Sequence, residues 1–206
     1  MIVRLLRSIA LLAAAAGLAA CASPLDKPPV EQRFYTLDVE RPAPARSGGA
    51  DVLAVRRFRA SPGYEGRELV FATNPGAYRT DFYNVFFAAP AGMVASETRE
   101  WLGRSGLFRS VVAGTSQADP RWILEGNLVS AHGEAEGGAN RAVLETQFLL
   151  LDARAADVPV VLDRTYREAV LVADGSAGAL AAGLNGALAA ILRRFEADLA
   201  ATLGRS

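Results

Sequence analysis

The segment from Ser176 to Leu203 constrains the fold most, because it places one apolar stripe along a long helix. Its large apolar residues recur every three or four positions: Leu180, Leu184, Leu188, Ile191, Leu192, Phe195, Leu199 and Leu203. Such spacing puts them on one helix face, which must be buried against another element. Residues 176–192 carry no charge, so a transmembrane span is the alternative interpretation. Alanine and glycine dominate this run and Asn185 lies in its middle, which favours a core helix packed closely on a sheet.

The rest of the chain predicts strands in two groups, each followed by a helix. We expect eight strands, at 33–39, 52–58, 68–73, 78–87, 107–113, 122–134, 141–153 and 164–172. The first helix starts at Pro90, which suits a first helical turn, and ends near Gly106. Turns at 74–76 and 134–140 predict hairpins. Strands in runs with two helices predict an α+β fold, a single domain whose mainly antiparallel sheet is covered on one face by two helices.

The first 20 residues are organised like a secretory signal peptide. Arg4 and Arg7 give a positive start, and the uncharged apolar run that follows is too short to span a membrane. The run ends in LAAC at 18–21, which resembles the lipobox of bacterial lipoproteins and holds the only cysteine of the chain. The resemblance implies that Cys21 receives a diacylglycerol and that residues 1–20 are removed. A plain signal peptide with an unrelated cysteine is the alternative.

The chain after the lipobox divides into a tether and a domain. Residues 21–32 contain three prolines, which is typical of an extended tether between an acylated Cys21 and a domain at 33–206. Each buried CH₂ of an acyl chain contributes about 0.8 kcal/mol, so two or three chains anchor a protein to a membrane stably. Without residues 1–20 the chain has 20 basic and 22 acidic residues. This balance predicts neither nucleic-acid binding nor a basic stripe for anionic lipid headgroups.

Nothing in the sequence has the pattern of a catalytic or metal site. His132 is the only histidine and is expected on the solvent face of a strand, with Ser130 near it by position alone. One histidine and an acylated cysteine cannot supply the nitrogen and sulfur ligands that zinc prefers. Two carboxylate pairs are expected on a solvated helix face or in a turn: Glu97 with Glu100, and Glu134 with Glu136. We therefore expect no enzyme activity, no catalytic residue, no metal and no cofactor.

The aromatic run DFYNVFF at 81–87 is the strongest candidate for a binding surface. Phe82 and Phe86 share one parity of the predicted strand, whereas Tyr83 and Phe87 share the other. A strand that is apolar on both sides is either buried on both or offers one face to a partner. The possible partner-binding residues are Phe82, Tyr83, Phe86 and Phe87.

Several segments together resemble the auxiliary lipoproteins of ABC-type transport systems, including the PqiC type. They are the lipobox, RFYTLD (33–38), LAVRRFRASPGYEGRELVF (53–71), DFYNVFFAAPAGM (81–93), WLGRSGLFRSVV (101–112) and the late small-residue helix. One departure is Phe86-Phe87, where other members often carry a tryptophan with a basic neighbour, so the choice of partner can differ.

The resemblance implies a non-enzymatic accessory subunit that works with an inner-membrane ABC permease and ATPase. Its other implied partner is a periplasmic protein of the mammalian-cell-entry type, and a second copy of the chain is a further candidate. Such systems move phospholipids or other hydrophobic molecules between the membranes. Ala22 follows Cys21 where an aspartate would signal inner-membrane retention, so the periplasmic face of the outer membrane is expected. The alternatives are an outer-membrane assembly or structural lipoprotein and, less favoured, a lipid-tethered hydrolase.

Overall fold

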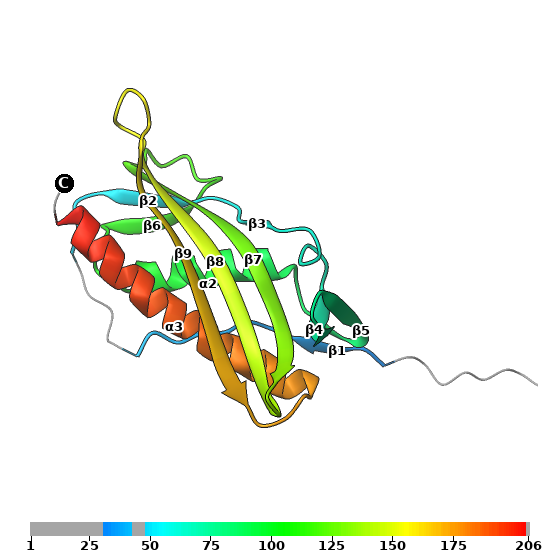
Figure 1. Cartoon of the computed structure of the whole chain (residues 1–206). Helices are drawn as coiled ribbons and strands as arrows, with labels where there is room; N and C mark the ends of the chain where they lie inside the picture. Colours follow the sequence, from blue (N-terminus) through cyan, green and yellow to red (C-terminus); the bar gives the residue numbers. More distant parts are fainter. Residues whose placement is uncertain (1–30, 43–47, 205–206) are drawn as a thin grey trace, which may run out of the picture. The chain divides into compact units, whose positions relative to one another are not determined.

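The computed structural model of the protein describes residues 31–42 and 48–204 (Figure 1). The predicted signal peptide, Cys21 and the tether up to residue 30 lie outside the described residues. The part of the chain described below is the compact unit that begins at Gln32.

Three long antiparallel strands form one side of the sheet: β7 (Trp122–Glu136), β8 (Ala139–Asp152) and β9 (Val160–Val172) (Figure 1). The turn between β7 and β8 contains Gly137 and Gly138, whose φ angles are 59° and 80°. Glycine adopts this left-handed conformation at little steric cost, which is why the Gly-rich turn closes a hairpin here. The predicted pair of long strands is confirmed.

Six shorter strands complete the sheet: β1 (Arg33–Tyr35), β2 (Val52–Val55), β3 (Arg59–Ala60), β4 (Glu68–Asn74), β5 (Ala77–Phe86) and β6 (Ser110–Ala113). β2, β3 and β4 follow one another along the other edge of β7, and each pairs with it in parallel. β6 flanks β2, β5 flanks β4 as the predicted hairpin, and β1 lies beside β5. Most paired residues are antiparallel, as predicted, but the short strands add five parallel pairings that the sequence did not indicate.

Helix α3 (Ala177–Leu203) packs on β8 and β9 (Figure 1). It begins after Ser176, whose side chain accepts a hydrogen bond from the N–H of Ala179 and so caps the first turn. The whole predicted stripe is buried except Leu203, which is partly buried. Gly183 allows the close approach, because a Cβ there would overlap Val172 and Ala142. The core-helix interpretation is confirmed, and no helix within residues 31–42 and 48–204 has both the length and the apolarity to cross a membrane.

Helix α2 (Pro90–Gly103) lies on the same side of the sheet as α3 (Figure 1). Its buried face includes Met93, Val94, Trp101 and Leu102, as the sequence predicts. The chain turns away at Gly106, where φ is 77°, a conformation that favours glycine and ends many helices. Two helices on one face of the sheet confirm the predicted α+β architecture.

The segment after β1 crosses both helices instead of continuing as the strand predicted at 33–39. The N–H of Asp38 donates to Oδ1 of Asn185 in α3, at 3.1 Å, and the N–H of Val39 donates to Oε2 of Glu97 in α2, at 3.0 Å. Side chains on the two helices thus accept hydrogen bonds from N–H groups that would pair with a neighbouring strand if β1 continued. Burial raises the pKa of Glu97, although the hydrogen bond from Val39 acts against it. Glu97 is therefore not the freely solvated residue that the sequence predicted.

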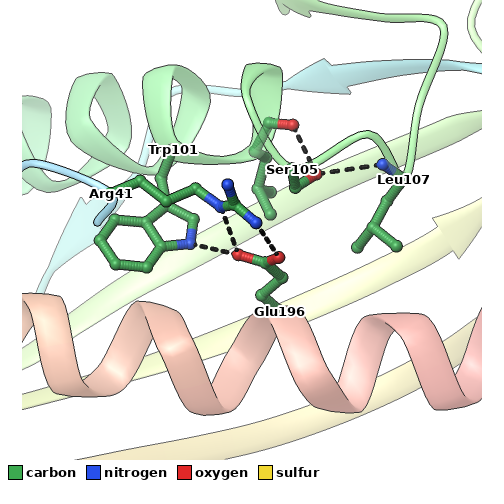
Figure 2. Close-up of polar contacts among 6 residues, drawn as sticks. Arg41, Trp101, Ser105, Leu107 and Glu196 are labelled. Carbon is green, nitrogen blue, oxygen red and sulfur yellow. Dashed lines mark hydrogen bonds and ion pairs between the residues drawn. The ribbon is translucent and has the colours of Figure 1, made fainter. Parts of the chain in front are cut away.

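Glu196 of α3 is the meeting point of this segment and both helices (Figure 2). Its carboxylate accepts from Nε and Nη2 of Arg41 at 3.0 and 2.8 Å, and from Nε1 of Trp101 at 2.7 Å. The hydrogen bond to Glu196 raises the pKa of Arg41, against the effect of burial. Figure 2 also shows the end of α2, where the hydroxyl of Ser105 accepts from the N–H of Leu107 at 3.2 Å.

Candidate functional site

Exposed aromatic rings gather at the β1–β5 edge of the sheet. Phe82, Tyr83 and Phe87 are 64, 55 and 70% exposed, and Phe34 of β1 is 53% exposed. The rings of Phe34 and Phe87 meet edge to face with centroids 6.4 Å apart, and those of Phe82 and Tyr83 do so at 5.5 Å. We call these four residues the aromatic edge. Large exposed aromatic groups are unusual on a small domain and are typical of interaction surfaces.

An irregularity in the β4–β5 hairpin lies at Phe82 and Tyr83. Leu69 of β4 pairs with Asp81 and the preceding Glu68 pairs with Val85, so residues 82–84 have no partners in β4. Oδ1 of Asp81 accepts from the N–H groups of Tyr83 and Asn84 at 3.0 and 3.1 Å and holds the bulge in place. Burial acts to raise the pKa of Asp81, but these hydrogen bonds and that of the Asn84 amide keep it below its ordinary value.

The bulge also breaks the period-two alternation of side chains that the sequence predicts along β5. Val85 and Phe86 are both buried, although they are neighbours, and Phe86 is only 2% exposed. Its N–H donates to the carbonyl of Arg67 at 2.6 Å, and its carbonyl accepts from Nε of Arg67 at 3.1 Å. Of the four possible partner-binding residues, Phe82, Tyr83 and Phe87 are therefore accessible, whereas Phe86 belongs to the core.

Phe34 is a member of the aromatic edge that sequence reasoning missed. It lies beside Val85 in the parallel pairing of β1 with β5, and the guanidinium of Arg67 lies 5.6 Å from its ring centroid. The only signal was its place in the alternating run 33–39, and that run gave no indication of which face would be covered. Next to it, Nε2 of Gln32 donates to the carbonyl of Phe82 at 2.9 Å. The last residue of the predicted tether is thus bound at the aromatic edge.

His132 is buried, which contradicts the prediction of a solvent-facing strand histidine. It is 7% exposed and lies on the sheet face opposite α3, because the neighbouring Gly133 faces Leu180 of that helix. The loop after β3 brings Tyr64 over it, with the rings stacked at 6.1 Å, and Tyr78 of β5 meets it edge to face at 5.6 Å. These tyrosines come from segments far from β7 in sequence, so the cover over His132 could not be seen in the local pattern.

Both ring nitrogens of His132 lie near polar side chains. Nδ1 lies 3.2 Å from the hydroxyl of Tyr64, and Nε2 lies 3.6 Å from Oε2 of Glu134. Burial lowers the pKa of His132, whereas Glu134 acts to raise it. Burial also raises the pKa of Tyr64 to about 12. Burial thus disfavours the charged form of the imidazole, which lies between a hydroxyl and a carboxylate, and Ser130 is not among the partners of its two nitrogens.

The remaining predicted polar groups lie apart from the aromatic edge. Glu100 of α2 is exposed and pairs with Arg104 at 2.7 Å, while Glu136 lies at the far end of β7. Among residues 31–42 and 48–204, no three His, Cys, Asp or Glu side chains are grouped so that they could hold a metal ion. The aromatic edge itself offers a partner apolar contacts and cation–π contacts.

Comparisons with known proteins identify the fold. The chain matches no family model and no curated protein sequence. Its fold is similar to that of a Xanthomonas campestris protein of the family described as DUF330, with a TM-score of 0.72 at 18% identity over 84% of this chain and 97% of that one. A crystal structure of an uncharacterised protein has a TM-score of 0.67 at 14% identity, over 82% of this chain and 99% of the other. The chain therefore shares the α+β fold of a DUF330 protein over nearly the whole length of that protein.

Proposed function

We propose that this protein is a lipid-anchored accessory subunit of an ABC-type transport system of the mammalian-cell-entry class, on the periplasmic face of the outer membrane. It acts by binding a protein partner at the aromatic edge, without catalysis. The system moves phospholipid or another hydrophobic molecule across the envelope. The PqiC-like lipoproteins that the sequence resembles are DUF330 proteins, and the shared fold supports the proposal at that level.

One observation carries the proposal: four exposed aromatic rings form the aromatic edge, at the start of the described domain. Nε2 of Gln32 donates to the carbonyl of Phe82, so the aromatic edge lies at the N-terminal start of the domain, which the proposed anchor at Cys21 would tether. A few residues supply most of the binding energy in many protein interfaces, and aromatic side chains are enriched at such interfaces.

The test compares two matched exposed apolar sites by affinity purification from membranes. Phe82→Ser with Phe87→Ser should release a mammalian-cell-entry-type protein that co-purifies with the wild type, while the domain stays folded. Leu171→Ser is the control, because Leu171 is 65% exposed at β9, away from this edge. Equal recovery of the partner with the wild type and both variants would show that the interface lies elsewhere. Recovery of an outer-membrane assembly protein, with no transport component, would replace the proposed function with the structural alternative.

The anchor has its own test. Cys21→Ser removes the only thiol of the chain, so the variant should not incorporate a fatty-acid probe and should keep its signal peptide. Ala22→Ser is the matched control and should be labelled like the wild type. Labelling of the Cys21→Ser variant would contradict the lipobox interpretation and leave the proposed binding at the aromatic edge unaffected.

A further inference from the structure

An open groove of about 990 Å³ is lined by four arginines from two separate segments of the chain. Arg56, Arg57 and Arg59 come from the connection between β2 and β3 and from β3 itself, whereas Arg99 comes from α2. The groove also reaches the end of β6 and the adjoining parts of β7 and β8. Its volume lies in the upper part of the range of small-molecule sites, roughly 300–1,000 Å³.

The arginine-bearing connection is fixed to the sheet. Phe58 is 3% exposed and covers Gly126 of β7, where a Cβ would overlap its ring. The ring of Phe58 also meets Phe148 edge to face at 5.7 Å. On either side of Phe58, the N–H of Arg56 donates to the carbonyl of Leu124 and that of Ser61 to the carbonyl of Leu128, both at 2.9 Å. Because the backbone is held at three points, the positions from which Arg56, Arg57 and Arg59 project are fixed before any ligand binds.

The groove carries a surplus of positive charge that the whole chain does not have. Glu125 is the only acidic residue lining it, and Arg56 binds it at 2.5 Å. Within residues 31–42 and 48–204, Arg57, Arg59 and Arg99 form no ion pair, and all three are exposed. Three uncompensated guanidinium groups thus share one concave surface of a nearly neutral protein. The overall charge balance, which predicted no basic site for lipid headgroups, does not reveal this local excess.

We propose that this groove binds a phosphate-bearing group, as a phospholipid headgroup or as free phosphate. Guanidinium groups match the oxygens of phosphate in geometry and charge, and a bidentate pair is among the strongest hydrogen-bonded contacts in proteins. Ser96, Thr115 and Asn127 add neutral donors to the lining. Val55 and Leu149 supply apolar walls, which suit the glycerol and first carbons of a headgroup better than a fully solvated ion. This binding site is distinct from the aromatic edge and does not depend on its partner.

The experiment uses the full lipid-anchored chain in a neutral detergent and titration calorimetry at low salt. The probes are glycerophosphoglycerol, which is a water-soluble phospholipid headgroup, inorganic phosphate and an octaglutamate peptide. The groove variant is Arg57→Gln with Arg59→Gln, and Arg99→Gln is a second variant on another element. The control, Arg109→Gln with Arg193→Gln, removes the same charge from exposed positions outside the groove.

We expect the phosphate probes to bind the wild type and the control alike, and the groove variant at least tenfold more weakly. Tighter binding of glycerophosphoglycerol than of phosphate identifies a lipid headgroup as the ligand, whereas equal affinity identifies the free anion; both support the proposal. Failure of both phosphate probes to bind the wild type would overturn it, as would equal affinities of the groove variant and the control. Arginine-dependent binding of octaglutamate alone would also overturn it and assign the groove to an acidic protein segment.

Discussion

Nε1 of Trp101 donates a 2.7 Å hydrogen bond to Oε2 of Glu196 and so joins α2 to α3 (Figure 2). Trp101 is 2% exposed, and the side chain of Arg41, which binds the same carboxylate, is 7% exposed. Two buried donors from different parts of the chain therefore share the Glu196 carboxylate. If a buried donor loses its acceptor, it remains removed from water without a hydrogen bond, which destabilises the folded state.

Glu196→Ala is expected to lower the free energy of unfolding by about 2–3 kcal/mol, because hydrogen bonds to charged groups contribute about 1.5–3 kcal/mol. Denaturant unfolding of the variant measures this loss. The exposed Glu65 offers a control, and Glu65→Ala should leave the unfolding midpoint nearly unchanged. A loss below about 0.5 kcal/mol for Glu196→Ala, the range of ordinary surface substitutions, would mean that Arg41 and Trp101 find other acceptors.

The two glycines in the middle of α3 should respond in opposite ways to the same change. Gly183→Ala is expected to destabilise the domain by about 1–3 kcal/mol, because its Cβ would overlap Val172 and Ala142 in the sheet. At Gly186 the nearest atom to a Cβ is Cγ1 of Val170 at 3.8 Å, an ordinary contact. Gly186→Ala should therefore stabilise the helix by up to about 1 kcal/mol. Thermal unfolding of both variants tests the pair, and a stabilised Gly183→Ala variant would contradict the observed packing of α3.

Thr146 is completely buried on β8, and its hydroxyl has no hydrogen-bond partner among the described residues. A buried unsatisfied polar group costs about 1–3 kcal/mol, whereas valine has nearly the same shape without the polar atom. Thr146→Val is therefore expected to raise the free energy of unfolding by about 1 kcal/mol. The exposed Thr80 of β5 gives a control substitution that should change stability little. A less stable Thr146→Val variant would show that the hydroxyl is satisfied within the core.

Elements that carry their own periodic pattern could be predicted from the sequence. The stripe of α3 repeats along nearly the whole helix, and Pro90 and Gly106 mark the start of α2 and the turn after it. β7 and β8 pair over their whole length around a Gly-rich turn. β3 could not be predicted in this way, because two residues have no periodicity and Arg59–Ala60 is a strand only through its pairing with β7.

The candidate site was predictable only in part, because its exposure is set by a bulge and by distant segments. The aromatic run was visible, but period-two alternation placed Phe82 and Phe86 together, whereas one is 64% and the other 2% exposed. Three residues without partners in β4 shift the register, and the hydrogen bonds of Asp81 that hold this bulge have no signal in the alternating pattern. Arg57 and Arg99 likewise line one groove because of where α2 packs, and the local sequence pattern around each residue does not predict this.

The stability of the domain should depend on pH through His132. Burial and Arg167 lower its pKa, while Glu134 and Glu145 act in the opposite direction, and Tyr64 and Tyr78 cover the ring. Since the folded-state pKa lies below the ordinary value of about 6.5, the unfolded chain binds the proton more readily. The free energy of unfolding should therefore be highest above about pH 6.5 and fall as the pH is lowered toward the folded-state pKa, by at most about 1.4 kcal/mol per pH unit.

The measurement is chemical unfolding at pH 8 and pH 5.5 for the wild type and for His132→Phe. Phenylalanine keeps a ring between Tyr64 and Tyr78 but cannot take up a proton, so this variant should lose less stability than the wild type between the two pH values. Tyr64→Phe removes the hydroxyl beside Nδ1 while the histidine stays covered, and its stability should still fall on acidification. An identical pH dependence in the wild type and His132→Phe would mean that the imidazole has the same pKa folded and unfolded, and that its burial has no effect on protonation.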